Sequence, residues 1–183
     1  MKMAKKLLAV VLTGVMAVSM LTGCASVSSR QVADELQGML KAVNDKATVK
    51  AVDANLANEA VKAAKNTDGT LKAENTLKTD VKTALSKNNN DKYVWYTYVE
   101  TKDLNKTTKA QKIAKAMMTT DNQGAKIDTT KAVNSADVKV NGKSGNQIEA
   151  GNKFELSMKP FTVGNTDYVM VVVTCKAVVK AAG

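Results

Sequence analysis

The stretch from residue 168 to residue 179, YVMVVVTCKAVV, decides how this chain folds. Successive side chains of an extended strand point to opposite faces of a sheet. One face of this strand carries small apolar residues, namely Val169, Val171, Val173, Cys175, Ala177 and Val179. The other face carries Tyr168, Met170 and Val172. Because both faces are apolar, the pattern predicts a strand at the centre of a sheet.

The chain before this strand, from about residue 125, also has β character. Asn141-Gly142 is a pair typical of a tight hairpin turn. In the following strand the apolar residues change parity along the chain, from Phe154, Leu156 and Met158 to Phe161 and Val163. Pro160, the only proline, lies between the two sets and predicts either a β-bulge or an edge strand at this point.

The first half of the chain has the apolar spacing of helices instead. Apolar residues recur at a period of about 3.6 from Val32 to Val43. Ser28 and Gln31 precede this run with the spacing of a capping box. A second helix is expected from about Thr48 to Ala64, and a third and weaker one from Ala73 to Leu85.

The two halves are joined by an aromatic strand and one more helix. Residues 93–99, YVWYTYV, are aromatic or β-branched and predict a strand, and a helix is expected from about Lys106 to Met118. The predicted fold class is therefore α+β, with a helical N-terminal half followed by an antiparallel β-sheet with one inserted helix. Residues 31–183 are long enough for a single domain with one core.

The aromatic strand carries the first candidate ligand contacts. Tyr93 and Trp95 share one face of the strand, while Tyr96 and Tyr98 share the other. One pair can fill the core, which leaves the other pair available to stack on a sugar ring or to contact a partner protein. The ordinary alternative is that both pairs serve only core and cross-strand packing.

Lysines of the inserted helix are the second group of candidates. Lys106, Lys109 and Lys112 lie mostly away from its apolar face and could contact an anionic or glycan ligand. The ordinary alternative is that these lysines solubilise an exposed helix face. Together with Trp95, Tyr93, Tyr96 and Tyr98 they make up the predicted ligand contacts.

The amino-acid composition argues against several classes of function. The 183 residues contain no His, which removes the commonest general base and the commonest transition-metal ligand. The formal net charge is +10, but Arg30 is the only arginine, and recognition of phosphate or guanine favours Arg over Lys. We therefore expect no catalytic residue, no metal site, no cofactor and no nucleic-acid partner.

The N-terminus has the layout of an export signal. Lys2, Lys5 and Lys6 precede an uncharged stretch from Leu7 to Gly23, as in a secretory signal peptide. The stretch closes with residues 21–24, LTGC, which resemble the lipobox of bacterial lipoproteins. That resemblance implies diacylglycerol on the sulfur of Cys24 and cleavage between Gly23 and Cys24. An uncleaved membrane anchor is the alternative.

The lipobox resemblance implies how the chain is organised and where it resides. Residues 1–23 would be removed, residues 24–30 would form a lipidated tether, and residues 31–183 would form the domain. The mature chain would be held to the bilayer through Cys24, on the extracytoplasmic face of the cell membrane, or in the outer membrane if the cell has two membranes. Cys175 would then lack a disulfide partner and is expected to be a buried small residue.

These features predict a membrane-anchored, non-enzymatic cell-envelope lipoprotein that acts as a binding or accessory module facing the cell wall or the exterior. Its partner would be a cell-wall glycan, an anionic polymer or another envelope protein. Two alternatives remain. One is a hydrolase of the cell wall that uses an unrecognised pair of carboxylates. The other is a structural subunit that assembles through the sheet edge near Pro160.

Overall fold

The computed structural model describes residues 27–87, 89–102, 108–121, 124–127 and 131–181. The predicted signal peptide, Cys24 and Lys106 therefore lie outside the described residues. The helices are α2 (Ser29–Lys41), α3 (Asn55–Ala64), α4 (Glu74–Ser86), α5 (Lys109–Ala116) and the 3-10 helix η2 (Gly145–Gln147). The longer strands are β1 (Thr48–Ala51), β2 (Lys92–Glu100), β7 (Ile148–Val163) and β8 (Thr166–Val179). No helix within the described ranges is long and apolar enough to cross a membrane.

The four longer strands form one sheet in the order β1-β7-β8-β2. The predicted α+β class is confirmed, with helices preceding most of the strands. The sheet is mixed rather than purely antiparallel, because β1 pairs in parallel with β7. Two short hairpins lie outside it, β3 (Thr119–Asp121) with β4 (Gly124–Lys126), and β5 (Lys139–Val140) with β6 (Lys143–Ser144).

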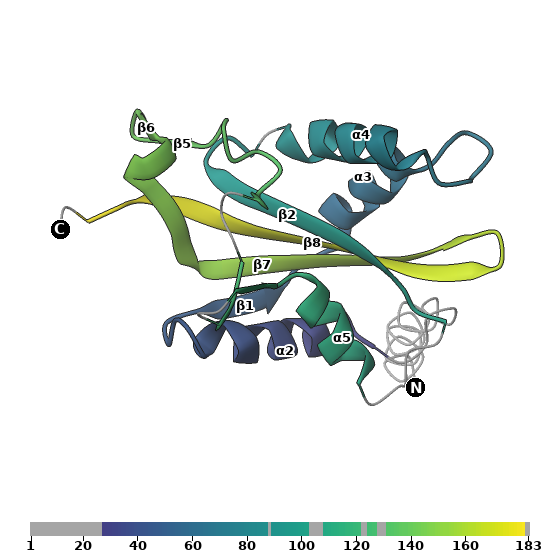
Figure 1. The fold of residues 1–183 in the computed structure, drawn as a ribbon, viewed down its shortest axis with the longest axis horizontal. Coiled ribbons are helices and arrows are strands. Elements are labelled where there is room, and N and C mark those ends of the chain that lie inside the picture. Colours follow the sequence, from purple (N-terminus) through teal and green to yellow (C-terminus); the bar gives the residue numbers. More distant parts are fainter. Residues whose placement is uncertain (1–26, 88, 103–107, 122–123, 128–130, 182–183) are drawn as a thin grey trace, which may run out of the picture.

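Strand β8 is the centre of the fold, as its sequence predicts. It pairs with β7 on one side and with β2 on the other, and both of its faces are buried. Val171 and Val173 face a core cluster that includes Leu36 of α2 and Ile113 of α5. Met170 and Val172 face a second cluster beneath α3 and α4. Figure 1 shows these two pairs of helices on opposite faces of the sheet.

Two local predictions are also confirmed at the level of single residues. The Ser28 hydroxyl accepts a hydrogen bond from the Gln31 N–H at 3.2 Å, and the Ser28 N–H donates to Gln31 Oε1 at 2.8 Å, which completes the capping box of α2. Asn141 and Gly142 have φ angles of 51° and 75°, so they form the expected tight turn between β5 and β6.

The prediction of a helix from Thr48 is wrong for its first residues. Thr48–Ala51 is strand β1, and α3 begins only at Asn55. Val49 and Val52 have helical spacing, but a helix here would leave the outer side of β7 unpaired. As built, the Val52 N–H donates to the Leu156 carbonyl at 2.9 Å, and the Val49 N–H donates to Oε1 of Gln37 at 2.9 Å. Non-local pairing therefore overrides the local period.

The structure also distinguishes between a β-bulge and an edge strand at Pro160. Pro160 pairs in register with Val169, so the predicted bulge is not there. The register shift lies between Ala150 and Phe154, where a Cβ on Gly151 would come within 3.0 Å of a backbone oxygen. At Pro160, β8 is the one strand paired with β7 among the described residues, so the edge alternative holds. The change of apolar parity reflects the two core clusters, which take Met158 and Phe161 respectively.

Helix α3 is fixed to the sheet by a cap that comes from another element. Its N-cap residue, Ala54, has no side chain able to bond the free N–H groups of the first turn. The Ser157 hydroxyl of β7 accepts a hydrogen bond from the Ala57 N–H at 3.1 Å and donates to the Asp53 carbonyl at 2.7 Å. Ser157 is 1% exposed, so water cannot replace these bonds.

We expect Ser157→Ala to lower the free energy of unfolding by about 1–2 kcal/mol, because it leaves a buried N–H and a partly buried carbonyl without their partner. Urea unfolding followed by circular dichroism measures this change. Ser144→Ala, at an exposed position of β6, is the matched control and should stay within about 0.5 kcal/mol of wild type. Equal effects of the two substitutions would contradict the role assigned to Ser157.

Candidate functional site

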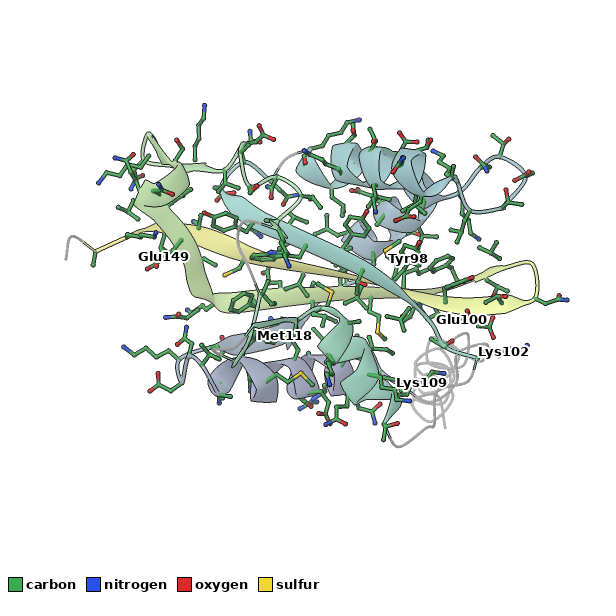
Figure 2. The ribbon with its side chains drawn as sticks, viewed as in Figure 1. Tyr98, Glu100, Lys102, Lys109, Met118 and Glu149 are labelled. Atoms are coloured by element: carbon green, nitrogen blue, oxygen red, sulfur yellow. The ribbon has the colours of Figure 1, made fainter. Side chains whose placement is uncertain are left out.

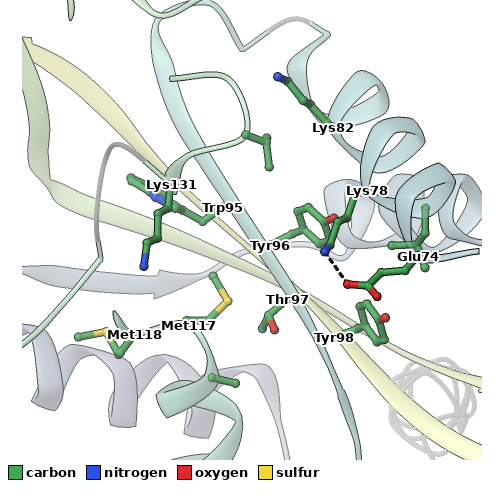
Figure 3. Close-up of a pocket in the computed structure, with 13 residues that line it drawn as sticks. Glu74, Lys78, Lys82, Trp95, Tyr96, Thr97, Tyr98, Met117, Met118 and Lys131 are labelled. Carbon is green, nitrogen blue, oxygen red and sulfur yellow. Dashed lines mark hydrogen bonds and ion pairs between the residues drawn. The ribbon is translucent and has the colours of Figure 1, made fainter. Parts of the chain in front are cut away.

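The main candidate site is a groove along the side of β2 that faces away from β8. Its volume is about 480 Å³. Figure 3 shows side chains of α4 on one side of β2, and the methionines that follow α5 on the other. The lining residues are Glu74, Leu77, Lys78, Lys82, Trp95, Tyr96, Thr97, Tyr98, Ala116, Met117, Met118, Lys131 and Val133.

The aromatic strand divides its residues between the core and the groove. Tyr93 and Trp95 are only 4% and 5% exposed, with their ring centroids 5.8 Å apart. Tyr96 and Tyr98, on the other face of β2, are half-buried and pack beside the α3 and α4 cluster. The groove takes in Trp95, Tyr96 and Tyr98, whereas Tyr93 lies outside its lining.

The described residues that line the groove include three lysines and a single carboxylate. Lys78 forms an ion pair with Glu74 at 2.5 Å (Figure 3). The hydrogen bond between them lowers the pKa of Glu74 and raises the pKa of Lys78. Lys82 and Lys131 are exposed, and no carboxylate within the described part of the chain pairs with them. The groove is therefore positively charged.

The pKa of Tyr96 depends on its burial and on the charge of Lys78. Desolvation raises the pKa of Tyr96, and the positive charge of Lys78 opposes that rise. The Tyr96 hydroxyl therefore stays protonated at neutral pH and can donate a hydrogen bond. A half-buried phenol beside an ammonium group can donate a hydrogen bond to an anionic oxygen, and its ring can stack on a planar or apolar group.

The lysines predicted as contacts do not line this groove. Lys109 and Lys112 lie on α5, which packs on the α2 face of the sheet. Figure 2 shows Lys109 and Tyr98 on opposite sides of the sheet. Lys106 is outside the described residues. The structure thus brings the aromatic strand together with Lys78, Lys82 and Lys131 rather than with the lysines of α5.

No protein-family model matches this chain, and no curated protein or solved structure matches it either.

The backbone of β2 is capped at one end of the groove. The Val94 N–H donates to Oδ1 of Asn134 at 3.0 Å, and the Val133 N–H donates to the Val94 carbonyl at 2.8 Å. The Asn134 amide donates in turn to the carbonyls of Lys92 at 2.7 Å and Asn89 at 2.9 Å. This cap ends before Tyr96.

Other reactive groups lie away from the groove. Cys175 is 1% exposed, as expected from its place on an apolar strand face, and its thiol donates to the Gly151 carbonyl at 3.3 Å. Burial raises the pKa of Cys175 to about 12, so the nucleophilic thiolate is not formed at neutral pH. Among the residues that the structure describes, no group of three Asp, Glu, Cys or His side chains comes together as a metal-ligand set.

The lysines of the groove could not have been selected from the sequence. Lys78 and Lys82 are spaced as neighbours on the polar face of a helix, which is the ordinary pattern for solvated side chains. Lys131 lies in a connection without a recognised motif. Only the packing of α4 beside β2 brings these residues to the aromatic strand.

Proposed function

We propose that this protein is a membrane-anchored, non-enzymatic lipoprotein of the cell envelope, and that it binds an anionic partner in the groove along β2. The observation that carries the proposal is the lining of that groove. Lys82 and Lys131 have no carboxylate partner among the described residues, and they lie beside two half-buried tyrosines and a pair of methionines. Such a surface can neutralise anionic groups and pack on apolar ones at the same time.

The lipobox at residues 21–24 supports the anchoring part of the proposal. With lipid on Cys24, the domain would be tethered through a very short segment, since α2 begins at Ser29. Five peptide units reach roughly 18 Å at most. The groove would therefore meet partners close to the extracytoplasmic surface of the membrane, whichever membrane of the envelope that is.

The acid content of the groove supports binding over hydrolysis. Glycoside hydrolysis usually requires two carboxyl groups on either side of the scissile bond. Among the described residues that line the groove, Glu74 is the one acid, and it is already paired with Lys78. The described part of this lining therefore offers no second acid to a wall hydrolase.

We expect the Cys24→Ser variant to lose lipid and to leave the membrane. In cells labelled with radioactive palmitate, the wild-type chain should carry label and sediment with membranes, because two or more acyl chains give stable anchoring. Cys175→Ser is the matched control and should keep both label and membrane association. Retention of label by Cys24→Ser would contradict the proposed anchor.

We expect charge removal in the groove to weaken anion binding more than equal charge removal on α5. The two variants are Lys82→Gln/Lys131→Gln in the groove and Lys109→Gln/Lys112→Gln on α5. Binding of the full chain in detergent is measured to poly-L-glutamate, through the fluorescence of Trp95, and to purified cell-wall sacculi, by co-sedimentation. The groove variant should bind at least about fivefold more weakly, since each exposed ion pair contributes up to about 1 kcal/mol.

The α5 variant carries the same net charge, so it reports the nonspecific attraction of a basic protein for polyanions. It should stay close to wild type at physiological salt. Equal weakening by both variants would mean that the groove is not the site. Absence of binding to both probes would contradict the proposed function.

A further inference from the structure

Beyond Val94, the outer edge of β2 lies in the groove and has no strand paired with it among the residues that the structure describes. In an antiparallel pair, the N–H and C=O groups of alternate residues point to opposite edges of a strand. Both backbone groups of Val94 point away from β8, because Asn134 and Val133 bond them. The Thr101 N–H points toward β8, where it donates to the Asp167 carbonyl at 2.8 Å. The N–H and C=O groups of Tyr96 and Tyr98 therefore also point away from β8.

No backbone or side-chain group of the described residues bonds to these outward groups of Tyr96 and Tyr98. The chain itself demonstrates that this edge accepts a partner, since residues 133 and 134 bond to it at Val94. Farther along the strand, the same edge presents two donors and two acceptors to the groove. Sheet edges of this kind are sites where an extended chain adds as a further strand.

The two sides of the groove differ in chemistry. On the α4 side the lining includes Lys78 and Lys82, and on the other side of β2 it includes Met117 and Met118 (Figure 3). A strand laid along the edge would point alternate side chains to these two sides. Acidic residues would meet the lysines, while apolar residues would meet the methionines.

We infer that the anionic partner is a protein segment in extended conformation, with acidic and apolar residues in alternation, that adds to the sheet as a fifth strand beside β2. This inference rests on the proposed function of the groove and names the chemical class of its ligand. Lysines along an edge also discourage pairing between two copies of the same chain, because the approaching edges would carry like charge. An acidic segment is free of that repulsion.

The other exposed margins of the sheet are less suited to strand addition. Strand β1 has only four residues. On β7, the Leu156 carbonyl points toward β1, so Pro160, four residues on, directs its nitrogen to the same side. That nitrogen has no hydrogen to donate. The subunit contact that the sequence suggested near Pro160 would therefore lack a hydrogen bond that the β2 edge can form.

The test uses the acetylated, amidated peptide TVEVEVT with a fluorescent label, and the full chain in detergent. Anisotropy titration should show binding that TVKVKVT lacks, because the lysine peptide has the opposite charge. Two further peptides carry N-methyl groups, either on both Glu residues or on the Val residues at positions two, four and six. Only one of the two sets of N–H groups can face β2. The peptide methylated on that set should bind at least about tenfold more weakly than TVEVEVT, and the other should bind within about threefold of it.

Equal affinities of the two methylated peptides would overturn strand addition. If the two methylated peptides bind equally while TVEVEVT and poly-L-glutamate both bind through Lys82 and Lys131, the groove still binds anions and only the strand model fails. If neither probe binds, the proposed function fails as well. Self-association of the chain is tested by measuring its mass in solution. If the chain self-associates, and this is lost in Tyr98→Pro but retained in Tyr98→Val, the occupant is a second copy of the chain. That result would also overturn the inference.

Discussion

The need to cover both faces of β8 determines the rest of this structure. Buried side chains point to both sides of the strand, so a single layer of helices would leave one set exposed to water. Burial of each large aliphatic side chain contributes about 1.5–3 kcal/mol. Two helical layers therefore follow, with α2 and α5 on one face and α3 and α4 on the other (Figure 1).

A central β8 leaves β2 at the margin of the sheet, and the groove arises there. Asn134 caps this margin at Val94 but not beyond it. Helix α4 and the methionines after α5 lie on either side of the remaining edge. A site that combines backbone hydrogen-bonding groups, lysines and apolar side chains thus results from the same arrangement that buries the core.

The sequence predicts those parts of the fold that local pattern controls. The two apolar faces of β8, the capping box of α2 and the Asn141-Gly142 turn are each encoded within a few residues. Strand β1 was missed because Val49 and Val52 have helical spacing, while their actual partners are in β7 and α2. The Ser157 cap of α3 was missed for the same reason, because its partners lie about 100 residues away in the chain.

Only part of the candidate site could be predicted from the sequence. The aromatic strand could be selected because four of the seven aromatic residues fall within six positions. Which pair faces the core depends on the register of β2 with β8, and that register fixes Tyr93 and Trp95 beneath the α2 and α5 layer. The choice of lysines depends on tertiary packing and has no local signal.

The most direct measurement of the central claim, an open edge at β2, is amide hydrogen exchange of the free protein by NMR. The account predicts slow exchange at Val94, Trp95 and Thr97, whose N–H groups bond to Asn134 or face β8. It predicts exchange at least about tenfold faster at Tyr96 and Tyr98, whose N–H groups point into the groove. Uniformly slow exchange along β2 would contradict the account, because it would mean that the edge is already occupied.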